Sequence, residues 1–276
     1  MDKHIRKIFS VFVLGMIALC VMRINAGDWT MVNWGMLLIA ALCCCLVFKC
    51  FVFIFNFSYA LACIFNGALI AIALPSVSSM LLGGAIVIYG LRLFLFTLNR
   101  YRSESYQPRV ANVQKEDAKL PFPIKIALWL QCSFLYVFHL FAIYMVASVA
   151  VLNSLLFAGI ALILFGTFIE ALGDAQKQAG KRKTPDTFVS SGILARWRHP
   201  NYTGEIIVQV GLIVAGFSAV SAGWANYAAF IIAPLYIILL MISEGGRADK
   251  YQLLRYGDDE GYKRYVARSG SLLPRF

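Results

Sequence analysis

Long apolar runs recur along the chain, and polar segments separate them. Eight runs resemble membrane spans, at residues 8–22, 34–52, 57–74, 80–98, 126–148, 152–170, 206–222 and 227–243. A spanning helix needs about 20 mostly apolar residues. Helices also satisfy their own backbone hydrogen bonds, as a lipid environment requires. The pattern therefore predicts an all-α fold, a polytopic transmembrane helical bundle of about seven to eight spans.

Composition agrees with this prediction. Of the 276 residues, 60% are hydrophobic and only 14% are charged, against about 45–50% and about 25% in soluble domains. These fractions exclude a soluble globular protein. The abundance of aromatic and β-branched residues also excludes a disordered chain.

The net charge of +11 reflects topology rather than nucleic-acid binding. If the N-terminus is cytoplasmic, segments 99–125, 171–205 and 244–276 are cytoplasmic too, and together with the N-terminus they carry 22 of the 25 Lys and Arg residues. This distribution follows the positive-inside rule. We therefore expect both termini to be cytoplasmic and no nucleic-acid partner. The membrane would be the bacterial inner membrane or, in a eukaryote, the endoplasmic reticulum.

Polar chemistry is concentrated in the second half of the chain. Residues 31–98 contain no acid and only two bases. We therefore predict an N-terminal membrane scaffold at 1–85 and a C-terminal domain at 86–276 whose cytoplasmic loops and tail form a site. The seven cysteines lie in or beside apolar runs, where they serve as small core or lipid-facing residues, and we predict no metal site.

Tyr89 and Arg92 form the first candidate pair. An ionisable residue within a span is costly and marks a candidate functional site. Their spacing of three places both side chains on one helix face. Two interpretations stay open for Arg92: a ligand-binding role, or a side chain that reaches water or pairs with a neighbouring helix.

A second constellation follows the span that ends at residue 170. Its acids and bases fall on one helix stripe at spacings of four, three and four, namely Glu170, Asp174, Lys177 and Lys181. The stripe fits a solvated, salt-bridged helix end. It also fits a dinucleotide site, where cations take phosphate and a carboxylate accepts ribose hydroxyls.

The most informative segment precedes the run at 206. Pro200 disfavours a helical conformation at the residue before it, and a helix N-terminus attracts anions. Donors and acceptors gather here in larger number than a helix cap requires, namely Arg196, Arg198, His199, Asn201, Tyr202 and Glu205.

Two motifs carry a family resemblance. They are Trp197-Arg198-His199-Pro200-Asn201-Tyr202-Thr203-Gly204-Glu205, which Gly192 precedes, and the earlier Glu170-x-x-x-Asp174-x-Gln176-Lys177. Together they resemble the C-terminal domain of the steroid 5-alpha-reductase and sterol reductase superfamily. They are most similar to the bacterial membrane-protein branch of that superfamily. The tail, with Lys250-Tyr251, Tyr262, Tyr265 and Leu273-Pro274, is similar to the superfamily's terminal pattern. The resemblance covers residues 86–276.

This resemblance implies an NADPH-dependent oxidoreductase that acts on a carbon–carbon double bond of a steroid-like, isoprenoid or other lipid within the bilayer. Tyr89 and Arg92 match its catalytic Tyr-x-x-Arg, in which the tyrosine polarises the substrate carbonyl. The implied cofactor-binding residues are Asp174, Lys177, Lys181, Arg198, His199, Asn201, Tyr202, Glu205, Arg247, Lys250 and Tyr251. Among them, Lys181 is expected to contact phosphate and to favour NADPH over NADH.

The sequence departs from the superfamily pattern at one point, and two alternatives to the reductase function stay open. Steroid 5-alpha-reductases pair the tyrosine with a membrane glutamate, whereas this chain has no acid between Asp28 and Glu104. Membrane methyltransferases that use S-adenosylmethionine share an Arg-His-Pro-x-Tyr motif, although their adjacent glutamates are replaced here by Ser243-Glu244-Gly245-Gly246. The other alternative is a non-catalytic lipid-binding membrane protein.

Overall fold

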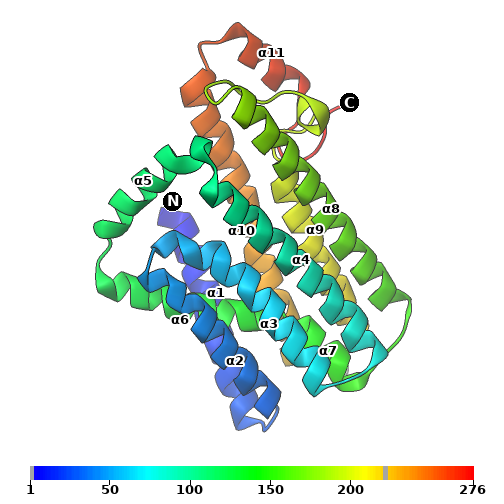
Figure 1. Ribbon diagram of the computed structural model, residues 1–276. Coiled ribbons are helices and arrows are strands. Elements are labelled where there is room, and N and C mark those ends of the chain that lie inside the picture. The colour runs from blue at the N-terminus through cyan, green and yellow to red at the C-terminus, as the bar shows by residue number, and fades with distance from the viewer. Residues whose placement is uncertain (1–2, 220–222) are drawn as a thin grey trace. The chain divides into compact units, whose positions relative to one another are not determined.

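The computed structural model of the protein describes residues 3–219 and 223–276, and its regular secondary structure there is helical (Figure 1). The elements are α1 (Lys3–Asn25), α2 (Met31–Cys44), η1 (Cys45–Phe48), η2 (Phe51–Phe55), α3 (Phe57–Ala73), α4 (Val77–Arg102), η3 (Glu104–Tyr106), α5 (Gln107–Ala118), α6 (Phe122–His139), α7 (Phe141–Val149), α8 (Ser154–Lys183), η4 (Gly192–Ala195), α9 (Pro200–Phe217), α10 (Trp224–Tyr256) and α11 (Glu260–Arg268). The predicted all-α class is confirmed.

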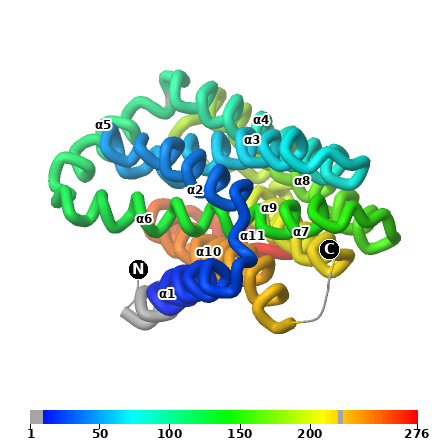
Figure 2. The backbone as a smooth tube through the Cα atoms, turned by 90° about the horizontal axis from the view of Figure 1, so that it is seen from below, coloured from blue at the N-terminus to red at the C-terminus, as the bar shows by residue number. Residues whose placement is uncertain are grey.

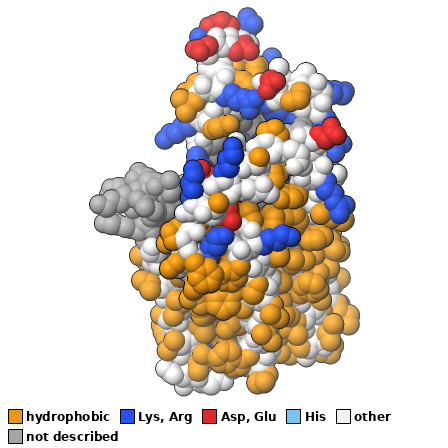
Figure 3. Space-filling view, turned by 60° about the vertical axis from the view of Figure 1, so that its left-hand side comes forward, with side chains coloured by type: hydrophobic (Ala, Val, Ile, Leu, Met, Phe, Trp, Pro, Cys, Tyr) orange, Lys and Arg blue, Asp and Glu red, His pale blue; other side chains and the backbone are white. Residues whose placement is uncertain are grey.

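Six helical segments of the described chain are long and apolar enough to cross a membrane. They are Met31–Phe48, Phe51–Ala73, Val77–Arg102, Phe122–Val149, Ser154–Lys183 and Trp224–Tyr256. The surface of the spanning helices is accordingly rich in hydrophobic side chains (Figure 3). The prediction of a multi-pass helical membrane protein is therefore confirmed.

The other two predicted runs are helical but do not belong to these six. The first run corresponds to a shorter apolar helix at Ser10–Asn25. The seventh corresponds to α9, whose first turn is polar, and the predicted end of that run at 220–222 lies outside the described residues. Two predicted spans are also interrupted. The run at 34–52 continues past Cys44 as short 3-10 helices, and the run at 126–148 breaks at Leu140 between α6 and α7.

The chain folds as two compact units. Unit 1 comprises Met1–Ile163 and Val210–Tyr236, and unit 2 comprises Leu164–Gln209 and Ile237–Phe276. The helices α8, α9 and α10 thus contribute residues to both units. This division differs from the boundary expected after residue 85, which stays a prediction.

Small residues bring α3 and α4 together in unit 1, and the two helices run side by side in Figures 1 and 2. A Cβ atom added at Gly90 would lie 2.8 Å from the backbone oxygen of Ala60, and one at Gly67 would lie 3.3 Å from that of Gly83. Close backbone approach through small residues is how membrane helices gain packing contacts. The pairing buries Tyr89 of α4 within unit 1.

Close backbone approach at glycines also joins α8 to α9 in unit 2. A Cβ atom at Gly166 would lie 2.5 Å from the backbone oxygen of Gly204, and one at Gly173 would lie 2.7 Å from Cγ of Pro200. The two α8 glycines are seven residues apart, which is about two helical turns, so both lie on the face of α8 that packs against α9. This packing places the start of α9 against the polar part of α8.

Candidate functional site

The candidate site of unit 2 is assembled from α8, the segment before α9, the first turns of α9, and the chain from α10 to the C-terminus. Pro200 is the first residue of α9, where its missing N–H is not needed. Gly192 adopts a positive φ of 60°, and Gln176 of α8 accepts a hydrogen bond from the backbone N–H of Ile193 at 2.9 Å. The 3-10 helix η4, which contains Ile193, is thereby held against α8.

Arg198 connects the segment before α9 to α10 and the tail. Its Nε and Nη2 donate to the two carboxylate oxygens of Asp249 at 2.9 and 3.1 Å. Its Nη1 donates to the backbone oxygen and to the hydroxyl of Ser269 at 2.5 and 3.1 Å. We call Arg198, Asp249 and Ser269 the tail clamp. The pair between Arg198 and Asp249 is bidentate and the Arg198 side chain is only 10% exposed, which gives Arg198 a structural role. Its role as a cofactor ligand stays a prediction.

His199 lies beside the clamp with its ring fully buried. Its Nε2 is 2.8 Å from Oδ1 of Asp249, and its ring stacks on that of Tyr202 with centroids 5.5 Å apart. Within the described chain its Nδ1 is buried and has no hydrogen-bond partner. Burial lowers the pKa of His199 and outweighs the opposing effect of Asp249. A neutral ring that donates from Nε2 leaves Nδ1 as an acceptor for a ligand.

The buried neutral histidine makes stability depend on pH. The pKa of His199 in the folded state lies below its ordinary value of 6.5. The unfolded state therefore binds more protons as the pH falls below that value, so stability is present above it and is lost on acidification. We expect the thermal unfolding temperature in detergent to fall between pH 8 and pH 5, and to fall less in His199→Gln. An identical pH dependence in the variant would contradict this assignment.

The carboxylates of the site are buried rather than solvated. Glu170, Asp174 and Glu205 are each 6% exposed, and Gln209 donates to Glu205 at 2.7 Å. A Cβ atom at Gly204 would lie 2.7 Å from the backbone nitrogen of Glu170, so the acids of α8 face the start of α9. Burial of carboxylates requires hydrogen-bonding or charged partners. The observation disfavours a solvated helix end for this stripe.

The two lysines of the stripe differ. Lys177 is half-buried, and its charge contributes to the lowered pKa of His199, after burial. Lys181 donates to the backbone oxygens of Pro185 and Thr187 and to the Tyr256 hydroxyl, at 3.0, 2.6 and 3.0 Å. An ammonium group has three donors, so Lys181 uses all of them to hold the loop after α8. Its role as a phosphate ligand stays a prediction.

The remaining predicted residues lie on α9 and α10. Asn201 and Tyr202 are half-buried in the first turn of α9. On α10, Arg247 pairs with Glu244 at 2.5 Å at the surface, and Lys250 and Tyr251 are exposed. Asn201 and Tyr202 thus follow His199 closely in the first turn of α9. On α10, the residue that contacts His199 is Asp249, which was not among the predicted residues.

Sequence reasoning missed Asp249 and the backbone acceptors of the tail. Trp197 donates from its indole to the Leu272 oxygen at 2.6 Å, and the Tyr265 hydroxyl donates to the Leu194 oxygen at 2.8 Å. An acid flanked by Arg247 and Lys250 in a basic tail is the one signal that could have singled out Asp249.

Tyr89 and Arg92 belong to unit 1. Tyr89 is fully buried, and its ring centroid is 6.1 Å from that of Tyr59 on α3. The Arg92 guanidinium lies 5.3 Å from the ring centroid of Phe96, one turn along α4. Both predicted residues therefore contact aromatic rings, Tyr89 that of Tyr59 on α3 and Arg92 that of Phe96 on its own helix.

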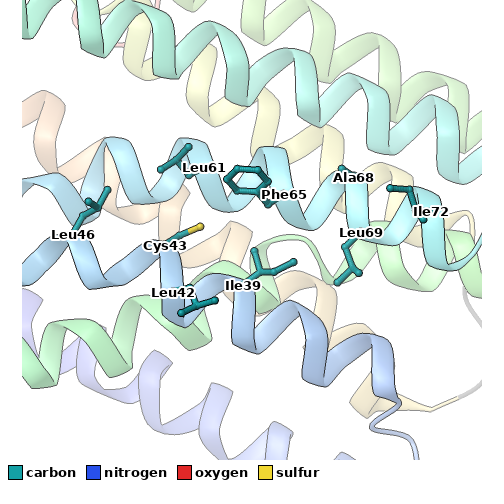
Figure 4. Close-up of a pocket in the computed structure, with 9 residues that line it drawn as sticks. All are labelled: Ile39, Leu42, Cys43, Leu46, Leu61, Phe65, Ala68, Leu69 and Ile72. Atoms are coloured by element: carbon teal, nitrogen blue, oxygen red, sulfur yellow. The ribbon is translucent and has the colours of Figure 1, made fainter.

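Unit 1 also carries an apolar groove of about 610 Å³ between α2 and α3 (Figure 4). Its lining residues are Ile39, Leu42, Cys43, Leu46, Leu61, Phe65, Ala68, Leu69 and Ile72. Apart from the Cys43 thiol, the side chains that line it are hydrocarbon, so the groove offers mainly apolar contact.

Comparison with known proteins identifies one family. The model of a family described as "Protein of unknown function (DUF1295)" matches residues 55–269. The match begins before the resemblance expected from residue 86 and covers both constellations described above. No curated protein and no solved structure matches the chain.

Proposed function

We propose that this chain, which belongs to the DUF1295 family, is a membrane-embedded oxidoreductase that uses NADPH to reduce a carbon–carbon double bond of a lipid. The family is related to steroid 5-alpha-reductase-like proteins. The observation that carries the proposal is the buried Nδ1 of His199, directly before α9, which has no hydrogen-bond partner in the described chain.

The residues of unit 2 fit a dinucleotide by their donor and acceptor types. Lys177 and the N-terminus of α9, near Asn201, favour an anionic group such as pyrophosphate. The carboxylates of Asp174 and Glu205 can accept ribose hydroxyls. Nδ1 of His199 accepts a ligand N–H or O–H, which both the carboxamide and the riboses carry. When bound, NADPH supplies the hydride.

The proposed catalytic residues of unit 1 act on the lipid. As hydride adds to an activated double bond, negative charge develops on the conjugated oxygen, and a positioned hydrogen-bond donor stabilises it. We assign that donor role to Tyr89 and an electrostatic role to Arg92. The cofactor residues and these two lie in different units, so each set can be tested separately.

Dinucleotide binding tests the proposal. We expect Asn201→Ala and Glu205→Ala each to raise the dissociation constant for NADPH about tenfold, or about 1.4 kcal/mol, in titration calorimetry of the detergent-solubilised protein. Both variants should keep the wild-type unfolding temperature within a few degrees. Lys263→Ala, which removes an exposed pair with Glu260, is the matched control and should bind NADPH normally.

Two results would overturn the proposal. One is binding of S-adenosylmethionine in place of NADPH by the wild-type protein, which would favour the methyltransferase alternative. The other is an equal loss of folding and binding in Asn201→Ala and Glu205→Ala, which would return these residues to a purely structural role.

A further inference from the structure

A buried arginine lies in the last turn of α1 in unit 1. Arg23 is only 7% exposed. Its Nη1 donates to the side-chain oxygen of Asn226 on α10 at 2.7 Å, and its Nη2 donates to the backbone oxygen of Asp28 at 3.3 Å. The guanidinium carbon also lies 4.8 Å from the ring centroid of Phe141 on α7. Arg23 therefore joins α1 to α7, to α10 and to the connection that leads to α2.

The positive charge of Arg23 has no acid partner in the described chain. An arginine is charged at any pH that proteins meet, and the groups that contact this one are an amide, a backbone carbonyl and an aromatic ring. Asp28 contributes its backbone oxygen, whereas its exposed side chain forms no ion pair with Arg23. The end of a helix favours a cation, but a buried charge is costly unless an opposite charge is close. The surroundings of Arg23 therefore favour an anionic group.

Two buried donors of this region lack acceptors. A guanidinium has five N–H donors, and within the described chain Nε of Arg23 is buried and has no hydrogen-bond partner. The same holds for the indole Nε1 of Trp29, whose side chain is also 7% exposed. The Trp29 ring stacks on Phe141 with centroids 6.4 Å apart, and this is the ring that Arg23 contacts. Buried polar groups nearly always have a partner, so the two donors indicate an acceptor supplied by a ligand.

Tryptophans indicate how deep this region lies in the membrane. Tryptophan is enriched at the level of the lipid headgroups. Three of the five tryptophans of the chain gather here. The Trp29 and Trp34 rings are 6.0 Å apart, and Trp224 precedes Asn226 by two residues. Trp34 and Trp224 are exposed. We infer that the end of α1 lies at the depth where phospholipids carry their phosphate groups.

The chain on both sides of Arg23 and Trp29 presents apolar side chains. Met22, Ile24 and Met31 are exposed, Met31 to 83%. A free anion gains nothing from such neighbours, whereas the hydrocarbon chains of a phospholipid cover apolar surface. These side chains therefore favour a phospholipid over a free anion as the source of the acceptor.

We propose that Arg23 and Trp29 bind the phosphate group of a phospholipid at the end of unit 1 that holds the connection between α1 and α2. The phosphate oxygens accept from Nε of Arg23 and from Nε1 of Trp29. Their negative charge compensates the buried guanidinium through a charge-assisted hydrogen bond. The inference concerns unit 1 alone and does not depend on the proposed reductase function.

Native mass spectrometry of the full-length protein in detergent tests this site. The probe is dioleoylphosphatidylglycerol, and the comparison ligand is dioleoylglycerol, which has the same hydrocarbon chains and no phosphate. We expect the dissociation constant of the phospholipid to be lower by about tenfold or more, and to rise about tenfold in Arg23→Gln. Arg100→Gln is the matched control, because the Arg100 guanidinium also lies over an aromatic ring, 4.4 Å from the centroid of Tyr106. This variant should bind the phospholipid normally.

Trp29→Phe keeps the test decisive if Arg23→Gln folds poorly after losing its bond to Asn226. Phenylalanine retains a ring against Phe141 and removes only an N–H group that has no protein partner. Stability without added lipid should therefore be preserved, whereas phospholipid binding should weaken.

Inorganic phosphate distinguishes the two sources of the phosphate group. We expect it to leave the unfolding temperature of the delipidated protein unchanged, since it has no hydrocarbon chains. Stabilisation by inorganic phosphate that depends on Arg23, without binding of the phospholipid, would overturn the lipid as the source. Equal affinity for phosphatidylglycerol and dioleoylglycerol, or phosphatidylglycerol binding that is unaltered in both variants, would overturn the site.

Discussion

Replacing Asp249 by alanine should lower the free energy of unfolding by about 3 kcal/mol, in the range for breaking a buried ion pair by removing one partner. The change leaves the largely buried Arg198 guanidinium without its bidentate acceptor and removes the acceptor of His199 Nε2. Thermal unfolding in detergent measures the loss. Limited proteolysis should also cleave the chain after α10 faster, since the clamp no longer holds Ser269.

The control for Asp249→Ala is Glu260→Ala. Glu260 pairs with Lys263 on the exposed surface of α11, where such pairs contribute about 0.2–1 kcal/mol. Asp249→Asn should fall between the two, because the amide keeps the shape and one acceptor but loses the charge. Equal stability of Asp249→Ala and Glu260→Ala would show that the tail clamp does not hold unit 2 together.

Much of the fold could be predicted because apolar runs report local structure directly. The six membrane-crossing segments all coincide with predicted runs, since length and hydropathy are properties of contiguous residues. The break at Leu140 was missed for the same reason. The residues around it are as apolar as those of an uninterrupted span.

The candidate site could be predicted only in part. The motif around His199 was visible because its polar residues are adjacent in sequence and precede a span. Its partner Asp249 is 50 residues away, and no spacing rule connects residues so far apart. The contact between Nε2 of His139 and the Tyr59 hydroxyl joins residues 80 apart, and the sequence did not predict it for the same reason.

The sequence also could not show whether the acids and bases of the α8 stripe, which begins at Glu170, are exposed or buried. The same spacing describes a solvated helix face and an interface, and the glycines that decide between them act across two helices. Gly166 and Gly173 let α9 approach closely enough to bury Glu170 and Asp174.

Gly166→Ala should therefore destabilise unit 2 by about 1–3 kcal/mol or more, the usual cost of overpacking. The added Cβ atom would lie 2.5 Å from the backbone oxygen of Gly204 and 2.8 Å from the backbone nitrogen of Val208. Backbone atoms of a packed helix cannot rotate away, so α8 and α9 must separate, and the start of α9 must shift from Glu170. We expect a lower unfolding temperature in detergent and weaker NADPH binding.

Gly84→Ala is the matched control for this last prediction. A Cβ atom at Gly84, inside α4, would meet no atom within 4 Å. The same substitution should there stabilise the helix by about 0.5–1 kcal/mol, because alanine loses less backbone entropy than glycine on folding. The two substitutions should therefore change the free energy of unfolding in opposite directions, which separates the effect of helix propensity from that of packing. Similar stabilisation in both variants would mean that α8 and α9 are not held by glycine contacts, and the burial of Glu170 would then need another explanation.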